Sequence, residues 1–163
     1  EQHADGAFHH GGRHDDWRRC ADGRRDDLQD LLIRDAFTTL LVSAPVTASD
    51  RARELLSVAA GAAEAKQAED LVAVDVSGPL PFADIFLVAS GRNERQVQAI
   101  ASEVEDRLIE FGVKPLRREG RSEGRWVLLD FGDLVVHVFH DEDRMYYSLE
   151  RLWSDCPAIP LGK

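Results

Sequence analysis

The sequence predicts an α/β fold for residues 46–163, preceded by an extension of different character. Three observations support this class. Segments with helical spacing of apolar residues alternate with short aliphatic runs that are typical of buried strands. Glycine and proline separate these segments. Hydrophobic residues make up 44% of the 163-residue chain, which is enough to build one compact core.

Residues 1–45 differ in composition from the rest of the chain. The first 25 residues are rich in His, Gly, Asp and Arg, so they cannot bury enough apolar surface to offset the entropy of ordering. We therefore predict an N-terminal extension that is disordered or not native to the protein. Residues 27–42 could form a short helix that Pro45 ends. We also hypothesise that native translation begins at Val46.

The first helix of the domain is expected from Thr47 to about Gln67. Thr47 is a suitable N-cap residue, and Asp50 occupies the position that can reach back to it. The segment is rich in alanine and repeats its apolar residues at helical spacing, which favours a helix. Two apolar runs follow, at residues 71–76 and 85–89, and both predict buried strands.

The second helix has sequence signals at both ends. Asn93 is a preferred N-cap residue, and Gln96, three positions later, completes a capping-box pattern. From Val97 to Phe111, the apolar residues recur at helical spacing and form one stripe. Gly112 can adopt the left-handed conformation that ends a helix, and Pro115 prevents its continuation. We therefore expect a helix with both ends fixed.

A β-hairpin follows a charged loop at residues 117–125. Its strands are expected at residues 125–130 and 133–139, with Phe131-Gly132 as a two-residue turn between them. The period of two along each strand divides the side chains between two faces. One face is almost purely aliphatic and is suited to the core.

The other face of this hairpin is chemically mixed. In the expected register, Trp126 lies opposite His137. Aromatic side chains surrounded by polar groups are typical of protein-binding patches. The alternative is that a helix of the same domain covers this face, and the pattern alone does not decide between the two. The face comprises Trp126, Leu128, Asp130, Asp133, Val135, His137 and Phe139.

The last helix is expected within residues 141–153. Met145, Leu149 and Trp153 are spaced by four, which places them on one side of such a helix. Residues 156–160 contain Cys-Pro and a second proline, which predict an irregular tail.

Charge and hydropathy narrow the classes of function. The net charge of −10 disfavours binding to free RNA and suits a basic protein partner, although it also serves solubility alone. No run approaches the roughly 20 apolar residues that span a bilayer, so we expect a cytoplasmic protein with no membrane association. The two cysteines, Cys20 and Cys156, lie far apart, and we expect two free thiols.

The residues give no positive case for catalysis, a cofactor or a metal. His137 and His140 are three apart on a strand, which places them on opposite faces, and no third ligand stands out. Ser90-Gly91 before a helix resembles a phosphate-binding turn, but a simple turn with an N-cap is favoured. No Asp-x-Asp pair lies on the hairpin strands to hold magnesium for nucleotidyl transfer.

Three blocks of sequence resemble the ribosomal silencing factor family, also called the RsfS or iojap family. They are ADIFLVASGRNERQVQAIASEVEDRL at residues 83–108, EGRSEGRWVLLDFGDLVVHVF at residues 119–139, and RMYYSLERLW at residues 144–153. In this order and spacing they cover nearly all of residues 46–163. We find no counterpart for residues 1–45.

The resemblance implies a fold and a function. The implied fold is similar to nucleotidyltransferase domains, a mixed sheet flanked by helices, without the catalytic carboxylates. The implied partner is ribosomal protein uL14 on the intersubunit face of the large subunit. Binding there would block the small subunit and lower translation when nutrients are scarce, with little direct nucleic-acid contact. Homodimers are also implied. The alternatives are a large-subunit assembly factor and a nucleotide-binding enzyme of the same fold.

The resemblance favours the mixed face of the hairpin as the surface that binds uL14 or a second copy. Trp126 is the expected anchor, because an indole offers a large apolar area and one hydrogen-bond donor. Replacing it by Ala is expected to weaken uL14 binding and leave the fold intact. Asp130 and Asp133 would meet basic groups of uL14. The full set of expected contact residues is Trp126, Leu128, Asp130, Asp133, His137, Met145, Tyr146 and Tyr147.

Overall fold

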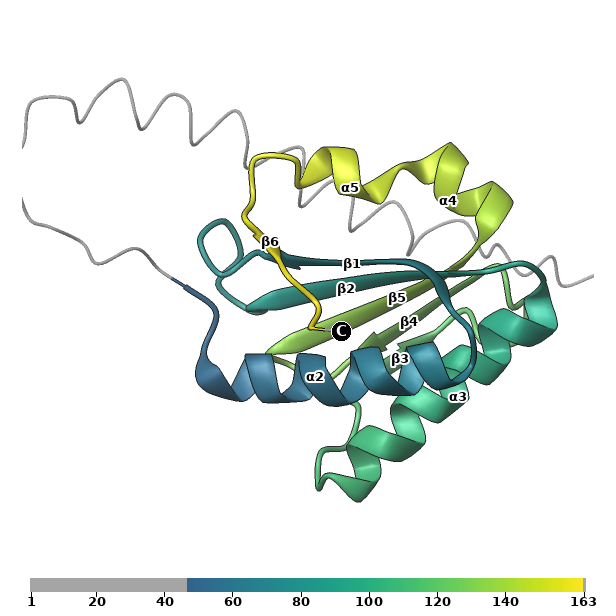
Figure 1. Ribbon diagram of the computed structural model, residues 1–163, viewed down its shortest axis with the longest axis horizontal. Helices are drawn as coiled ribbons and strands as arrows, with labels where there is room; N and C mark the ends of the chain where they lie inside the picture. Colours follow the sequence, from purple (N-terminus) through teal and green to yellow (C-terminus); the bar gives the residue numbers. More distant parts are fainter. Residues whose placement is uncertain (1–46, 163) are drawn as a thin grey trace, which may run out of the picture. The chain divides into compact units, whose positions relative to one another are not determined.

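The structure of the chain is a computed structural model that describes residues 47–162 (Figure 1). The expected extension, the short helix at residues 27–42 and Cys20 lie outside the described residues. The elements in chain order are α2 (Asp50–Ala65), β1 (Glu69–Asp75), β2 (Ile85–Gly91), α3 (Glu94–Glu110), β3 (Arg117–Glu119), β4 (Trp126–Asp130), β5 (Leu134–His140), α4 (Asp141–Tyr147), α5 (Leu149–Leu152) and β6 (Ala158–Ile159).

The strands of the described part form a six-stranded mixed sheet in the order β3-β4-β5-β2-β1-β6. The central neighbours β2 and β5 are parallel, and the other neighbouring strands are antiparallel. Helices α2 and α3 cover one side of the sheet, whereas α4 and α5 lie over the other (Figure 1). This arrangement confirms the expected α/β class with a mixed sheet flanked by helices.

The main core lies between the sheet and the helix pair α2 and α3. The apolar stripe expected for α3 is fully buried there from Val97 to Leu108, but its last member, Phe111, is exposed beyond the end of the helix. The buried stripe packs against the aliphatic face of the hairpin, as predicted. The residues of that face are Val127, Leu129, Leu134, Val136 and Val138, and none of them is exposed. Burial of this many aliphatic side chains is the main stabilising contribution to the domain.

The N-terminus of α2 differs from the prediction. Ser49, not Thr47, is the N-cap residue, and its hydroxyl accepts a hydrogen bond from Ala52 N at 3.2 Å. The reason lies in contacts with residues that are distant in the sequence. The Ala48 amide donates to the carboxylate of Asp75 at 2.8 Å, and the Ser49 amide donates to that of Asp84. These two bonds hold the chain extended until Ser49, so the helix begins later.

Both predicted ends of α3 are confirmed. The Asn93 side chain accepts a hydrogen bond from Gln96 N at 2.9 Å, which satisfies a free amide of the first turn. At the other end, Gly112 has φ +96°. The Val113 amide donates to Leu108 O at 2.9 Å, the wide hydrogen bond of a Schellman motif.

The hairpin register differs from the prediction by two residues. Trp126 pairs with Phe139, and His137 pairs with Leu128. The turn is centred on Gly132-Asp133 rather than Phe131-Gly132, because Phe131 is buried and its amide donates to Leu134 O at 2.9 Å. A shift of two keeps every side chain on its predicted face. The composition of the two faces is therefore as expected, whereas the cross-strand partners are not.

Two strands and one helix break differ from the prediction. Strand β3 lies within the predicted charged loop, and β6 lies within the predicted irregular tail. The single expected helix over residues 141–153 is divided at Ser148, which has φ +43°. Across this division Met145 is exposed whereas Leu149 packs inward, so the expected stripe of residues spaced by four does not form.

Candidate functional site

Helices α4 and α5 cover the mixed face of the hairpin (Figure 1). Trp126 is 7% exposed. Leu128 and His137 are also buried. The expectation that these three side chains form an accessible anchor is wrong, because Tyr147 and Leu149 pack over the cluster that contains Trp126. The alternative considered from the pattern, a helix of the same domain over this face, describes the structure.

The buried side of this site is an aromatic cluster. The Trp126 ring stacks on Phe139 with centroids 4.7 Å apart, and it contacts Tyr147 at 5.1 Å. The Trp126 indole also donates a hydrogen bond to His137 Nδ1 at 3.2 Å. Further along the same face, Phe86 meets Trp153 edge-on at 5.3 Å. These rings form the base on which α4 and α5 rest.

The outer side of α4 carries two exposed apolar residues. Met145 is 81% exposed and Tyr146 is 80% exposed. Tyr147, the next residue, is half-buried and packs inward against Trp126. Of the expected contact residues with apolar side chains, only Met145 and Tyr146 are therefore available at the surface.

The two expected acidic contacts lie elsewhere. Asp133 is exposed directly before β5, and α4 begins directly after β5. A seven-residue strand spans roughly 20 Å, so Asp133 and α4 lie at opposite ends of it. Asp130 lies at the turn as well, where its carboxylate accepts a hydrogen bond from Gly132 N at 2.8 Å. The structure does not bring these carboxylates together with Met145 and Tyr146.

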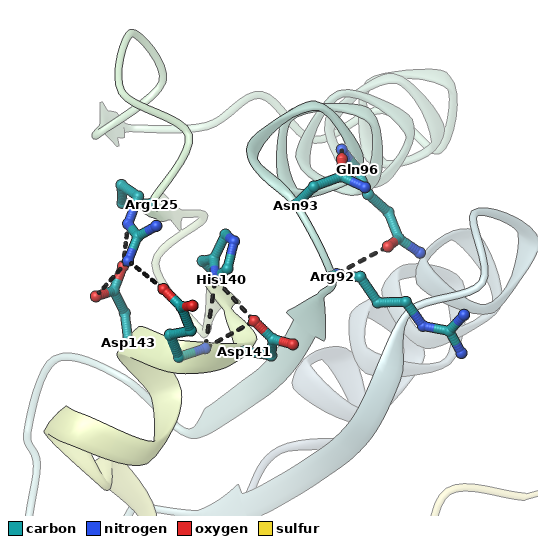
Figure 2. Close-up of polar contacts among 8 residues, drawn as sticks. Arg92, Asn93, Gln96, Arg125, His140, Asp141 and Asp143 are labelled. Carbon is teal, nitrogen blue, oxygen red and sulfur yellow. Dashed lines mark hydrogen bonds and ion pairs between the residues drawn. The ribbon is translucent and has the colours of Figure 1, made fainter.

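The acidic residues on the same helix as Met145 and Tyr146 are instead those at the start of α4. Asp141, Glu142 and Asp143 form its first turn. Figure 2 shows Arg125 reaching from the start of β4 towards this turn, with its Nε 2.7 Å from Asp143 Oδ2. The hydrogen bonds that Arg125 donates to Asp143 and then to Glu142 raise the pKa of its guanidinium above the usual value. His140 is the N-cap residue, and its Nδ1 lies 3.3 Å from Glu142 N.

Arg144 and Ser90 belong to the site but were not expected there. Arg144 Nη1 donates to Ser90 Oγ at 2.7 Å, and its Nε donates to Glu150 Oε1 at 2.7 Å. Ser90 is almost fully buried at the end of β2. Its hydroxyl is engaged by this arginine. Ser90 and Gly91 are the last two residues of β2, so the expected turn does not form there, whereas the capped helix expected after them does. No sequence signal links Arg144 to Glu150, because residues six apart are not neighbours on a continuous helix.

Two further features of the described residues bear on the class of site. Within residues 47–162, no three His, Cys, Asp or Glu side chains are grouped so that they could hold a metal ion. His137 packs edge-on against Phe86 and His140 caps α4, so the two histidines serve separate contacts. None of the helices in the described part is long and apolar enough to cross a membrane.

A family model described as "Ribosomal silencing factor during starvation" matches residues 49–163. This match covers most of the chain. The chain belongs to the ribosomal silencing factor family. Membership of this family places it among ribosome-associated regulators of translation.

Relatives across bacteria and plants agree with the ribosomal silencing factor assignment. "Ribosomal silencing factor RsfS" of Bacillus subtilis is 48% identical over 109 residues, which are 67% of this chain and 92% of that protein. The protein of the same name from Chromobacterium violaceum is 39% identical over 111 residues, 68% of this chain and 91% of the relative. "Protein Iojap, chloroplastic" of Zea mays is 31% identical over 153 residues, 85% of this chain and 65% of the relative.

Two solved structures share the fold of this ribosomal silencing factor domain. A crystal structure from Bacillus halodurans has a TM-score of 0.61 and 46% identity, and the match covers 67% of this chain and 99% of that one. A crystal structure from Chromobacterium violaceum has a TM-score of 0.62 and 38% identity, with coverage of 63% and 85%.

Proposed function

We propose that this chain represses translation by binding ribosomal protein uL14 on the large subunit, where it sterically blocks the small subunit. The relatives named above are ribosomal silencing factors, which supports a ribosomal target. The proposed mechanism involves no chemical step. A protein that occupies a surface needed for subunit joining prevents joining for as long as it stays bound, so the inhibition depends on the affinity and lifetime of the complex.

One observation indicates where the chain would contact uL14: Met145 and Tyr146 are adjacent, large and about four-fifths exposed. Together with Asp141 and Glu142 they define what we call the α4 surface. Contiguous exposed apolar side chains that are rimmed by polar groups mark interaction sites. Aromatic residues and methionine are enriched in the central parts of protein interfaces. The α4 surface is therefore the proposed docking site.

The buried aromatic cluster supports the α4 surface from below. Tyr147 is fixed against Trp126 and Phe139, and it directly follows the exposed pair in sequence. A side chain that is already held in place loses less conformational freedom on binding, which favours affinity. In this proposal Trp126, Leu128 and His137 do not touch the partner. They form the base that sets the position of α4.

The charges of α4 suit a basic partner. The side chain of Glu142 is 73% exposed and that of Asp141 is 51% exposed. Exposed carboxylates attract a positively charged protein and speed encounter, although they add little affinity once bound. The association rate with large subunits is therefore expected to fall as the salt concentration rises.

The test is binding of the purified chain to large ribosomal subunits and to isolated uL14. Replacing both Met145 and Tyr146 by Ala is expected to weaken binding by about thirtyfold, since one central aromatic is typically worth about 2 kcal/mol. Leu116→Ala is the matched control. Leu116 is 76% exposed and lies beside the turn between β4 and β5, away from α4. Equal affinity in the double variant and the wild type would reject the α4 surface.

A second assay separates binding from blocking. Large subunits saturated with the chain are mixed with small subunits, and joined ribosomes are measured by sedimentation. Loss of joined ribosomes supports the blocking mechanism. Normal joining with the chain still bound would contradict it and would favour a role in large-subunit assembly. Sedimentation of the chain alone tests the homodimer that the family resemblance implies.

A further inference from the structure

We infer that Arg144 is the positioning residue of the α4 surface: by bridging Ser90 and Glu150 it fixes the direction in which Met145 and Tyr146 project. The inference rests on the proposed function and deepens it. It concerns a residue that would not touch the partner. Its role would be to hold the docking surface in the orientation that binding requires.

The contacts of Arg144 join three elements. Its side chain is only 11% exposed. One nitrogen, Nη1, reaches Ser90 Oγ at the end of β2, and two others, Nε and Nη2, reach Glu150 Oε1 in α5 at 2.7 and 2.6 Å. The guanidinium thus ties α4 to the body of the domain and to the next helix at once. A planar group with donors in fixed directions can make both contacts, whereas a lysine ammonium has no such fork.

The helices themselves are too short to fix this geometry. Helix α4 has seven residues, α5 has four, and neither contains a fully buried residue. Helices of this length are unstable alone, because the cost of nucleation is not recovered over so few hydrogen bonds. Their position therefore depends on tertiary contacts. Within the described residues these include the packing of Tyr147 and Leu149, the ion pairs of Arg125 and the bridge made by Arg144.

The direction of the exposed pair follows from the same bridge. Arg144 and Tyr147 contact the body of the domain from one side of α4, and Met145 and Tyr146 lie between them in sequence. Ser148 then reverses the chain in the left-handed conformation, and its hydroxyl donates to Met145 O at 2.8 Å. With both flanking residues held inward, the two between them project to solvent. Without the bridge, this stretch would lose its inward contact on the N-terminal side of Met145, and Tyr147 would hold only the other side.

The experiment compares Arg144→Gln and Arg144→Lys with the wild type for binding to large subunits, at a temperature where all are folded. We expect Arg144→Gln to weaken binding by about tenfold, the size of a lost hydrogen-bonded charge, with Arg144→Lys in between. Arg151→Gln is the matched control. It removes the same charge from an exposed position of α5, and it should bind like the wild type. Removing a positive charge should, if anything, help attraction to a basic partner, so a loss cannot be a long-range charge effect.

Two further measurements make the outcome specific to positioning. In Arg144→Gln, hydrogen exchange should speed up in residues 141–152 and stay unchanged in α2 and α3. Ser90→Ala combined with Arg144→Gln should bind no more weakly than Arg144→Gln alone, because both remove the same bond. Should Arg144→Gln fail to fold, Glu150→Gln replaces it, since Glu150 is partly exposed and its loss leaves the Ser90 contact intact.

Wild-type affinity in a folded Arg144→Gln variant would overturn the inference, as would an equal loss in Arg151→Gln. Neither result would affect the proposed function, which the Met145 and Tyr146 variants test. Failure of the wild type to bind large subunits would instead reject the proposed function. In that case the hydrogen-exchange comparison still decides whether Arg144 holds α4, and unchanged exchange in residues 141–152 would reject the inference.

Discussion

The Trp126 indole N–H donates a hydrogen bond to Nδ1 of His137, at 3.2 Å across β4 and β5. The two residues are diagonal neighbours, since Trp126 pairs with Phe139 and His137 pairs with Leu128. An Nδ1 that accepts a hydrogen bond carries no proton, so this contact selects the tautomer with its hydrogen on Nε2. The bond therefore satisfies the polar atom of a buried indole and fixes the tautomer of a buried histidine.

Trp126→Ala should lower the free energy of unfolding of the domain, because Trp126 is a packing residue and not a contact residue. The ring is buried and contacts Phe139, Tyr147 and His137. Truncating a buried aromatic residue of this size typically costs about 3–5 kcal/mol. The free energy of unfolding, measured with urea, checks this value. Tyr146→Ala is the control, since an exposed side chain should change stability by no more than about 0.5 kcal/mol. An unfolding free energy unchanged in Trp126→Ala would contradict the observed packing.

Gln67→Gly should stabilise the domain. Gln67 follows the last turn of α2 with φ +57°. There its amide donates to Glu64 O and the next amide, of Ala68, donates to Ala63 O, the pair of bonds that usually selects glycine. Glycine adopts this conformation without the steric penalty of a Cβ atom, which is worth about 1 kcal/mol. A thermal unfolding midpoint that rises above that of the wild type is the expected result. Gln98→Gly, within α3, should lower the midpoint instead.

Gln96→Ala should loosen two helix ends at once. The Gln96 side chain accepts a hydrogen bond from Arg92 N (Figure 2) and donates to the terminal carbonyls of α2 at Lys66 and Gln67. Loss of one cap typically costs about 1 kcal/mol, and this residue serves both helices. Urea denaturation of Gln96→Ala and of Arg95→Ala, an exposed neighbour, tests this point. The expected order of stability is wild type and Arg95→Ala together, with Gln96→Ala below them.

Asp75 should make stability depend on pH in the acid range. Burial raises the pKa of this carboxyl, but hydrogen bonds from Ser77 and Ala48, together with the charge of Arg53, outweigh burial and lower the pKa below 3.8. A carboxyl with a lowered folded-state pKa contributes stability above its unfolded-state pKa, and the contribution is lost as pH falls through the folded-state value. The wild type should therefore exceed Asp75→Asn by a constant amount above about pH 5, and the difference should shrink below about pH 4. A difference that grows on acidification would contradict the assignment.

Local signals in the sequence predicted the elements whose ends depend on neighbouring residues. Asn93 and Gly112 specify the limits of α3 through bonds that span only a few residues. The two faces of the hairpin were also predictable, because alternation along a strand survives a register shift of two. The start of α2 was not predictable, because the acceptor for the Ala48 amide, Asp75, is supplied from a distant part of the chain.

The exposure of the expected contact residues could not be read from the sequence. An aromatic cluster next to polar groups has the same pattern whether a partner or the chain's own helix covers it. Here Ser148 decided the outcome, because its left-handed conformation divides the last helix and folds α4 and α5 over Trp126. Met145 is exposed and Leu149 packs inward, although helical spacing had placed the two on one side of a single helix. Serine is an unusual residue for that conformation, so no rule predicted the break.

The parallel pairing of β2 with β5 has a consequence for how the chain reaches its native state. Strands β1 and β2 form one antiparallel ribbon and β3 to β5 form another, each from residues close in sequence. The seam between them joins Ile85 to Leu134, with all of α3 in the intervening loop. Closing such a loop costs chain entropy before any contact across the seam can compensate. We therefore expect the two ribbons to form early and the pairing of β2 with β5 to limit the folding rate. In partial unfolding, we expect β2 and β5 to separate first.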